Sequence, residues 1–457
     1  MTTRAHVLVV GGGLAGVECA WQIARRGHRV RLVEMRPIKK TDAHATDRLA
    51  EMVCSNSFRS DNPANAVGLL KREMELVGSL VMEEARRAAV PAGDALAVDR
   101  TVFAEAVTRR IEATPGIELF RAEVEAIPDL EEGPVVLATG PLTSKALEGP
   151  LLEALGEAYL YFYDSVAPIV EASSLDMSRL FFASRWGKGG GADYLNVPLG
   201  REEYEAFVAE LLAGEKVPFH DFEKAVYFEG CLPIETMAER GIETLRHGPM
   251  KPFGLTDPTT GRSPYAVVQL RQDDLAKGTF NLVGFQTKLR TGEQKRIFRM
   301  LPGLEKAEFV RFGLLHRNTY LNGPAHLDRF FAWKKDPRLF FAGQITGVEG
   351  YLESAATGLM VGATLAQRLE GREPVPVPFS TALGALCRHV SERPLRDFAP
   401  MNVTFGMIDE TGLPEARDRE GRRREICSRA LREIGAWKDL ALPVSGAALS
   451  SAALQGR

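Results

Sequence analysis

The chain has 457 residues, of which 45% are hydrophobic and 26% are charged, and its formal net charge is −3. This composition excludes a largely disordered chain, and the length predicts two or three folded domains. The small net charge excludes strong attraction of the whole chain to nucleic acid, although it leaves room for local basic patches.

Signals for export, membrane insertion and metal binding are missing from the sequence pattern. No apolar run reaches the roughly 18 residues that a membrane helix needs, and the first residues lack the charged and then apolar pattern of a signal peptide. The five cysteines are odd in number, widely spread and without the paired spacing of zinc ligands. We therefore expect a cytoplasmic protein with free thiols, no bound metal and no membrane association.

The first 34 residues predict a strand, a loop, a helix and a second strand. The strands are expected at 6–10 and 29–34, and the loop between them matches the G-x-G-x-x-G pattern of dinucleotide-binding proteins. In this pattern the first glycine permits a tight turn, the second lets the backbone approach a pyrophosphate, and the third lets helix and strand pack closely. The residues predicted to contact the dinucleotide here are Gly11, Gly12, Gly13, Leu14, Ala15 and Gly16.

An acid at the end of the second strand supports the same prediction. Glu34 lies about 20 residues after the start of the loop, where a carboxylate accepts hydrogen bonds from ribose hydroxyls. The diphosphate is expected at the N-terminus of the first helix, because unpaired amides and the helix dipole favour negative charge there.

Two later segments predict strands that end at the same edge of a sheet. Val135 to Gly140 is apolar and finishes in Ala-Thr-Gly, and residues 337–343 finish in Ala-Gly before a helix that extends to Leu369. A second helix start of this kind can point amide groups at the far end of the same cofactor. The residues predicted to line this end are Thr139, Gly140, Gly343, Gln344, Gly350 and Tyr351.

Together these segments resemble the two-dinucleotide-binding-domain flavoproteins, in which such a loop and two such strands converge on FAD. The resemblance implies an α/β fold with a Rossmann-like FAD-binding domain, and it favours FAD over NAD as the tightly held cofactor. That domain is predicted to be discontinuous, at 1–159 and 316–373. Residues 160–315 mix strands and turns and predict an inserted α+β substrate domain, and residues 374–457 predict a mainly helical C-terminal extension that begins with a proline-rich segment.

Two cysteines have unusual surroundings. Cys54 is set among small polar residues and an arginine just after the nucleotide-binding unit, and Cys231 follows a glycine between two carboxylates. A thiolate is the reactive form of cysteine; cations favour it and nearby acids oppose it, so Cys231 requires a cation such as Arg246 or Lys251. We expect the other three cysteines to be small buried hydrophobic residues, and these are Cys19, Cys387 and Cys427.

Five segments carry a more specific resemblance, and they are Gly11–Glu18, Cys54–Ser60, Phe228–Glu235, His316–Thr319 and Gly343–Tyr351. They closely resemble the folate- and FAD-dependent tRNA uracil-5 methyltransferase family. In that family a methylene group passes from 5,10-methylenetetrahydrofolate, by way of reduced FAD, to C5 of the uridine at position 54 in the tRNA T loop. NADH or NADPH supplies the electrons.

The resemblance implies roles for the two unusual cysteines. Uracil C5 is a poor nucleophile until a group adds at C6, and a thiolate is suited to that reversible addition. Cys231 is the candidate for this attack and Cys54 the candidate for assistance at the flavin; the alternative exchanges the two roles. The candidates for lining the folate are Arg185, His316, Arg317 and Asn318. The basic patches at 417–432 and 334–335 are candidates for contacts with the phosphates of the tRNA T arm.

Other interpretations stay open at this point. One is the larger flavoprotein relative that modifies the tRNA wobble uridine, which carries a long C-terminal helical domain and needs a partner GTPase. Another is a flavin-dependent NAD(P)H oxidase without an RNA substrate, in which Cys54 would be a redox-active thiol. A flavin-bound protein without catalysis is a third. No feature of the sequence indicates an oligomeric state.

Overall fold

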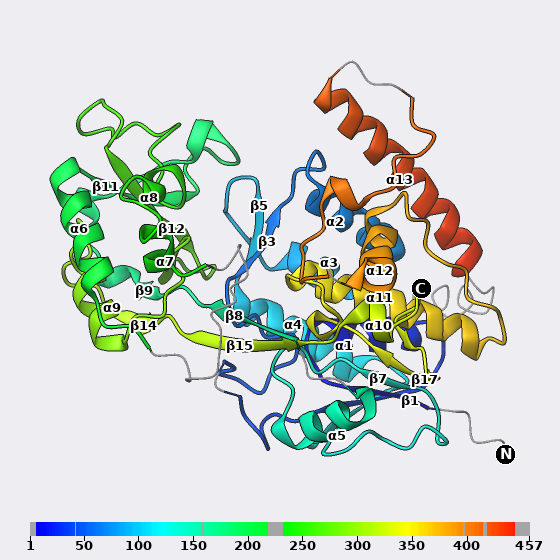
Figure 1. Cartoon of the computed structure of the whole chain (residues 1–457). Coiled ribbons are helices and arrows are strands. Elements are labelled where there is room, and N and C mark those ends of the chain that lie inside the picture. The colour runs from blue at the N-terminus through cyan, green and yellow to red at the C-terminus, as the bar shows by residue number, and fades with distance from the viewer. Residues whose placement is uncertain are drawn as a thin grey trace, which may run out of the picture.

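The computed structural model describes residues 6–41, 43–156, 160–217, 232–395, 398–414 and 418–443. The described elements gather around two sheets that lie side by side and are joined by a pair of long strands (Figure 1). Cys231 lies outside the described residues.

Within the described residues, the first sheet has six strands in the order β16-β17-β7-β1-β2-β6. Its strands are β1 (Val7–Val10), β2 (Val30–Glu34), β6 (Ile117–Arg121), β7 (Val135–Leu137), β16 (Ala332–Trp333) and β17 (Asp336–Phe341). All neighbours are parallel except β16, which pairs antiparallel with β17 at one edge. The central strands are short, apolar and buried, as expected for a parallel sheet covered on both faces. The predicted α/β fold is therefore confirmed.

Two helices pack against one another above this sheet, α1 (Leu14–Ala24) and α11 (Tyr351–Leu369). Their backbones approach closely because α11 has glycines at the contact. A Cβ atom at Gly358 would lie 2.1 Å from the carbonyl oxygen of Ala15, and one at Gly362 would lie 2.8 Å from that of Cys19. The loops that precede the two helices are thereby held at the same edge of the sheet, although more than 300 residues separate them in sequence.

A small antiparallel sheet and further helices complete this half of the molecule. The sheet has the order β3-β5-β4. The elements are β3 (Ser57–Ser60), β4 (Ala89–Val90), β5 (Ala95–Val98), α2 (Ala66–Val77), α3 (Leu80–Arg87), α4 (Arg100–Ala113), α5 (Lys145–Leu155) and α10 (Gly323–His326). Strand β3 begins three residues after Cys54, so this small sheet is the next element along the chain after the cysteine.

The second sheet is antiparallel and has the order β10-β11-β12-β13-β9-β14. Its strands are β9 (Ile169–Glu171), β10 (Phe181–Phe182), β11 (Tyr194–Leu199), β12 (Ala266–Gln272), β13 (Thr279–Leu282) and β14 (Phe309–Arg311). The helices of this part are α6 (Arg201–Ala213), α7 (Ile234–Ala238), α8 (Thr244–His247) and α9 (Thr291–Phe298). Apolar side chains from one face of the sheet join those of the helices in a separate core.

The opposite face of the second sheet carries buried polar side chains. On β13, Phe280 and Leu282 belong to the core, so the residue between them points to the other face. That residue is Asn281, which pairs across the strands with Arg271 of β12. Both are almost completely buried, at 2% and 7% exposure.

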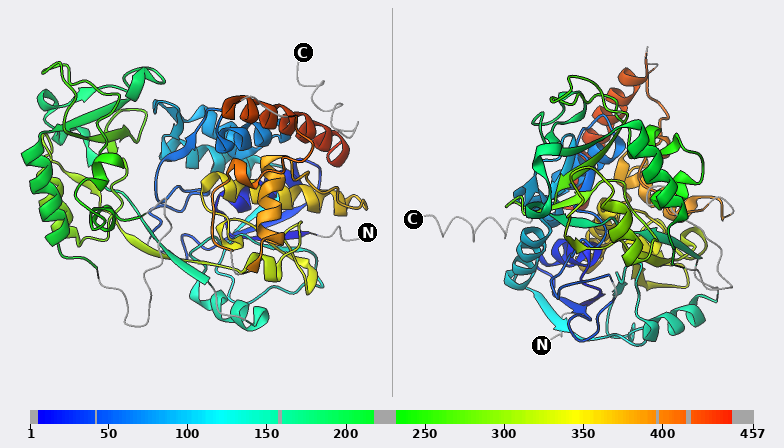
Figure 2. Two further views of the ribbon diagram at one scale, coloured as in Figure 1. Left: turned by 45° about the horizontal axis from the view of Figure 1, so that its top comes forward. Right: turned by 90° about the vertical axis from the view of Figure 1, so that its left-hand side faces the viewer.

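The two halves are connected by β8 (Leu160–Ser165) and β15 (Leu315–Tyr320), which pair antiparallel along their whole length. Two views agree that this pair runs from the first sheet to the second (Figure 1, Figure 2). The chain thus enters the second sheet after β8 and returns from it through β15. The predicted limits at 159/160 and 315/316 fall next to these crossings, and as domain boundaries they stay a proposal.

The last part of the described chain is mainly helical, with α12 (Ala382–Glu392) and α13 (Arg419–Ala441). Residues 374–378 between α11 and α12 have no regular secondary structure. Helix α13 packs against α2 on the outside of the first half (Figure 1). Among the described helices, none combines the length and the apolar character that a bilayer crossing requires.

Candidate active site at the carboxyl edge of the first sheet

The opening loop, the end of β2 and the segments after β7 and β17 surround a cavity of about 1030 Å³, which we call the first cavity. The predicted cofactor-binding residues that line it are Gly11, Gly12, Gly13, Leu14, Ala15, Glu34, Thr139, Gly140, Gly343, Gln344 and Tyr351. Segments from four distant parts of the sequence thus meet at one edge of the sheet. The other two predicted residues, Gly16 and Gly350, do not line this cavity.

Each glycine of the loop has its own physical role. Gly11 has a φ of +106°, and a Cβ there would lie 2.3 Å from the carbonyl oxygen of Ala138 on the neighbouring segment. Gly16 allows close packing, since its Cβ would lie 1.8 Å from the carbonyl oxygen of Gly11. A Cβ at Gly13 would meet no atom within 4 Å and would project into open space at the N-terminus of α1. The backbone there leaves room for a group such as a phosphate.

Glu34 holds the loop and a neighbouring arginine. Its Oε2 accepts a hydrogen bond from the Gly12 N–H, and its Oε1 accepts from the Arg36 Nε–H, both at 2.9 Å. Burial acts to raise the pKa of Glu34, but the hydrogen bonds and the positive charge of Arg36 outweigh it and leave the pKa below its usual value. The predicted ribose acceptor is therefore a carboxylate that also orders the loop.

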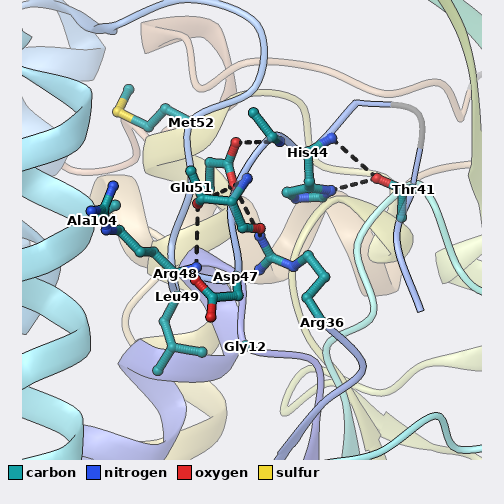
Figure 3. A network of polar contacts seen from close by, with 12 residues as sticks. Gly12, Arg36, Thr41, His44, Asp47, Arg48, Leu49, Glu51, Met52 and Ala104 are labelled. Carbon is teal, nitrogen blue, oxygen red and sulfur yellow. Dashed lines mark hydrogen bonds and ion pairs between the residues drawn. The ribbon is translucent and has the colours of Figure 1, made fainter. Parts of the chain in front are cut away.

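Arg36 was not among the residues singled out from the sequence. Its side chain is 2% exposed, and its Nη1 donates to Glu51 Oε2 at 3.1 Å. Glu51 also accepts from the backbone N–H of Ala45 at 2.8 Å, and nearby the Thr41 hydroxyl contacts His44 Nδ1 at 2.6 Å (Figure 3). These contacts order the segment between β2 and β3, and Thr41, His44 and Glu51 of this segment line the first cavity. Nothing in the local pattern distinguishes Arg36 from an ordinary surface arginine.

A second cavity of about 1270 Å³ adjoins the first. The two have five lining residues in common, and these are Val53, Pro141, Leu142, Gln344 and Tyr351. The second cavity reaches the polar face of the second sheet, because Arg271 and Asn281 line it, and it also contains Cys54. A molecule bound in one cavity would therefore lie against a molecule bound in the other.

Cys54 is held at this junction by Tyr351. The backbone N–H of Cys54 donates to the Tyr351 hydroxyl at 2.5 Å, and that of Ser55 donates to the same oxygen at 3.3 Å. Tyr351 begins α11, and its ring packs edge-on against Phe58. The predicted residue Gly350 lines the second cavity beside it.

Three guanidinium groups surround the segment that contains Cys54. Arg100 donates to the Met52 carbonyl at 3.3 Å, and Arg311 donates to the Val53 carbonyl. Burial lowers the pKa of Arg311 and of Arg271. Guanidinium groups from α4, β12 and β14 thus contact residues 52–56, on both sides of Cys54.

The predicted folate-lining residues lie in different places relative to the two cavities. Asn318 is buried and lines the second cavity. Arg185 does not line either cavity; its guanidinium contacts the side chain of Gln269 and donates to the Lys251 carbonyl at 2.5 Å. The side chains of residues 316 and 317 lie outside the described part.

The arginines of α13 are largely engaged with their own chain. Arg422 Nε donates to Glu410 Oε2 at 2.7 Å, and Arg429 Nη1 donates to the Thr411 carbonyl at 2.8 Å. Arg424 pairs with Glu420 one turn away. Within the described residues, much of this patch therefore stabilises the attachment of α13.

Comparison with known proteins places this architecture in a family. Residues 6–373 match the model of the family described as glucose inhibited division protein A. The solved structure of Aquifex aeolicus GidA superimposes with a TM-score of 0.68 at 16% identity, covering 99% of this chain and 76% of that one, which shows a shared fold.

Much closer sequence relatives are curated as methylenetetrahydrofolate–tRNA-(uracil-5-)-methyltransferase TrmFO. The protein of Geobacter sulfurreducens is 57% identical over 432 residues, covering 94% of this chain and 98% of its own length. That of Moorella thermoacetica is 56% identical over 425 residues, covering 93% and 96%. The resemblance inferred from the sequence is thereby confirmed, and the chain belongs to the TrmFO family.

Proposed function

We propose that this protein is a methylenetetrahydrofolate–tRNA-(uracil-5-)-methyltransferase that forms 5-methyluridine at position 54 of the tRNA T loop. 5,10-Methylenetetrahydrofolate would supply the carbon, and FAD reduced by NADH or NADPH would supply the electrons. The observation that supports this most strongly is the junction of the two cavities at Val53 and Tyr351, with Cys54 beside it. A reaction that joins a flavin, a folate and a base needs such adjacent sites.

The first cavity fits FAD. The N-terminus of α1 with Gly13 would hold the diphosphate, and Glu34 would face the ribose. The segments at Thr139 and Gly343 would hold the other end of the cofactor. When bound, FAD supplies the redox chemistry of the reaction. The protein would contribute orientation of the cofactor through the segment that Arg36 and Glu51 hold at the wall of the cavity.

The second cavity is the proposed place for the folate ring and the target uracil. It combines apolar walls with polar groups, and Asn318 is the predicted folate-lining residue found there. Cys54 lies at the side shared with the first cavity and would assist there. In the proposed chemistry, the thiolate of Cys231 adds to C6 of uracil, which makes C5 nucleophilic, and it leaves after C5 has gained the carbon and lost its proton.

The tRNA is proposed to approach from the side of the inserted domain, at 160–315. The target base must leave the folded T loop to enter the second cavity, which costs about a few kcal/mol of unstacking. Contacts with phosphates would offset this cost. The candidates for these phosphate contacts are Lys335 and those arginines of α13 that do not pair with an acid of the same chain.

The activity itself is tested with an unmodified tRNA transcript, NADH and methylenetetrahydrofolate, beside a reaction that contains S-adenosylmethionine instead. We expect nucleoside mass analysis to find 5-methyluridine at position 54 only with the folate. Modification of the wobble uridine would favour the larger flavoprotein relative. NADH consumption without any modified base would favour a flavin oxidase, and either result would contradict the proposal.

FAD binding at the loop is tested by Gly13→Val. The φ of −74° at Gly13 suits any residue, and a Cβ atom there has no other atom within 4 Å, so we expect the variant to fold normally. The side chain would occupy the proposed phosphate position and weaken FAD binding by about tenfold or more, which corresponds to about 1.4 kcal/mol. Flavin content and FAD titration measure this. Gly435→Val, also without a close neighbour but in α13, is the control, and equal FAD affinity in both variants would refute the assignment.

The roles of the cysteines are separated by Cys231→Ala and Cys54→Ala. Each should lower formation of 5-methyluridine by about a hundredfold or more, because each removes a reacting or assisting thiol. Only Cys231→Ala should abolish covalent capture of tRNA that contains 5-fluorouridine, as seen by gel shift under denaturing conditions. Cys427→Ala, in α13, serves as the control. An undiminished adduct with Cys231→Ala would assign the attack to another residue.

A further inference from the structure

Arg271 and Asn281 are neighbouring polar residues on the wall of the second cavity. Both are buried, although some of their polar atoms make no hydrogen bond within the described part of the protein. They are directly opposite one another on β12 and β13, and both line the cavity that contains Cys54. Their neighbours Leu270 and Leu282 point the other way into the core of the second half. The pair therefore projects from a rigid central part of the sheet.

The amide group of Asn281 lacks a partner. The side chain is 2% exposed, and within the described part of the chain no hydrogen bond engages its buried Nδ2. Buried polar groups without partners are rare in folded proteins because their desolvation is uncompensated. Asn281 thus lines the cavity and keeps a donor that pairs with no described group of the protein, which makes it a candidate to pair with a ligand.

Arg271 is held from one side only. Its Nε donates to Asn56 Oδ1 at 2.8 Å, and Asn56 is itself fixed by donating to the carbonyls of Val98 and Gln272, each at 3.0 Å. In the described residues, the two terminal nitrogens of the guanidinium have no hydrogen-bond or ion-pair partner. The arginine is therefore oriented by Asn56 and presents its outer edge to the cavity.

The second cavity also has apolar lining residues, among them Val53, Val166, Ala167 and Val283, together with polar ones such as Ser55, Gln286 and Asn318. Apolar surface with a few polar groups is typical of a site that binds a flat ring. An amide offers one donor and one acceptor side by side, and a ring with a carbonyl beside an N–H offers the complementary pair. The guanidinium adds donors for the same carbonyl oxygen.

We propose that Arg271 and Asn281 bind the carbonyl and N–H edge of a planar lactam ring in the second cavity. This inference rests on the proposed function and deepens it, because both the pterin of a folate and the uracil of tRNA carry such an edge. The site would fix the orientation of the ring next to Cys54 and Tyr351. Donors aimed at the carbonyl oxygen would also favour negative charge on it.

The test uses the FAD-loaded protein and the variant Asn281→Leu, which has a similar volume and no polar atom. If the amide serves a ligand, its removal should leave the melting temperature unchanged or raise it, while affinity for one ligand falls at least tenfold. Asn196→Leu is the matched control on the same sheet. Asn196 is fully buried and donates to the carbonyls of Ala183 and Tyr194, both at 3.0 Å, so its replacement should lower the melting temperature.

Two titrations distinguish the two sources of the ring. Weaker binding of tetrahydrofolate by calorimetry, with unchanged binding of an unmodified tRNA transcript, would assign the site to the pterin. The reverse would assign it to the uracil, and Arg271→Lys should weaken the same ligand. Unchanged affinity for both, or a melting temperature that falls as in Asn196→Leu, would overturn the proposal. Failure of the wild-type protein to form 5-methyluridine would instead refute the proposed function, independently of these affinities.

Discussion

The close packing of α1 against α11 is the constraint on which the rest of the structure depends. A Cβ atom at Gly358 would lie 2.1 Å from the Ala15 carbonyl oxygen, so any side chain at this position would force the two helices apart. Their contact fixes the loop before α1 and the segment before α11 at one edge of the sheet. The first cavity is lined by both, and the junction with the second cavity depends on Tyr351, the first residue of α11. A shift of either helix would therefore alter both cavities together.

The second cavity illustrates how charge and burial combine in this protein. Arg100, Arg271 and Arg311 come from α4, β12 and β14, and they converge on the segment that ends in Cys54. Buried guanidinium groups cost free energy unless they are paired, so such a cluster is stable only where carbonyls, carboxylates or a bound anion offset the repulsion. In contrast, Arg422 and Arg429 of the arginine-rich helix α13 are satisfied by an acid and a carbonyl of the turn beside the helix. A count of basic residues alone does not distinguish these two situations.

Local patterns predicted much of the fold and about half of the site. The strands at β1, β2, β7 and β17 and the loop at Gly11 follow from short apolar runs and glycine spacing, and the strands lie within three residues of their expected limits. Arg36, Arg271 and Asn281 were not predicted, because their significance arises from partners far away in sequence: Arg271 contacts Asn56 across 215 residues. The only signal for Asn281 is a polar residue between two apolar ones in a short strand. Arg185 was predicted to line the folate site but lies outside both cavities.

The central claim is that the two cavities meet, so that a folate in the second would touch a flavin in the first. The most direct measurement is the absorption spectrum of the bound flavin during titration of the FAD-loaded protein with tetrahydrofolate, with equilibrium dialysis in parallel. We expect a saturable change in the flavin bands that follows the dialysis curve and ends at a single folate per chain. Stoichiometric binding of the folate with an unchanged flavin spectrum would contradict it.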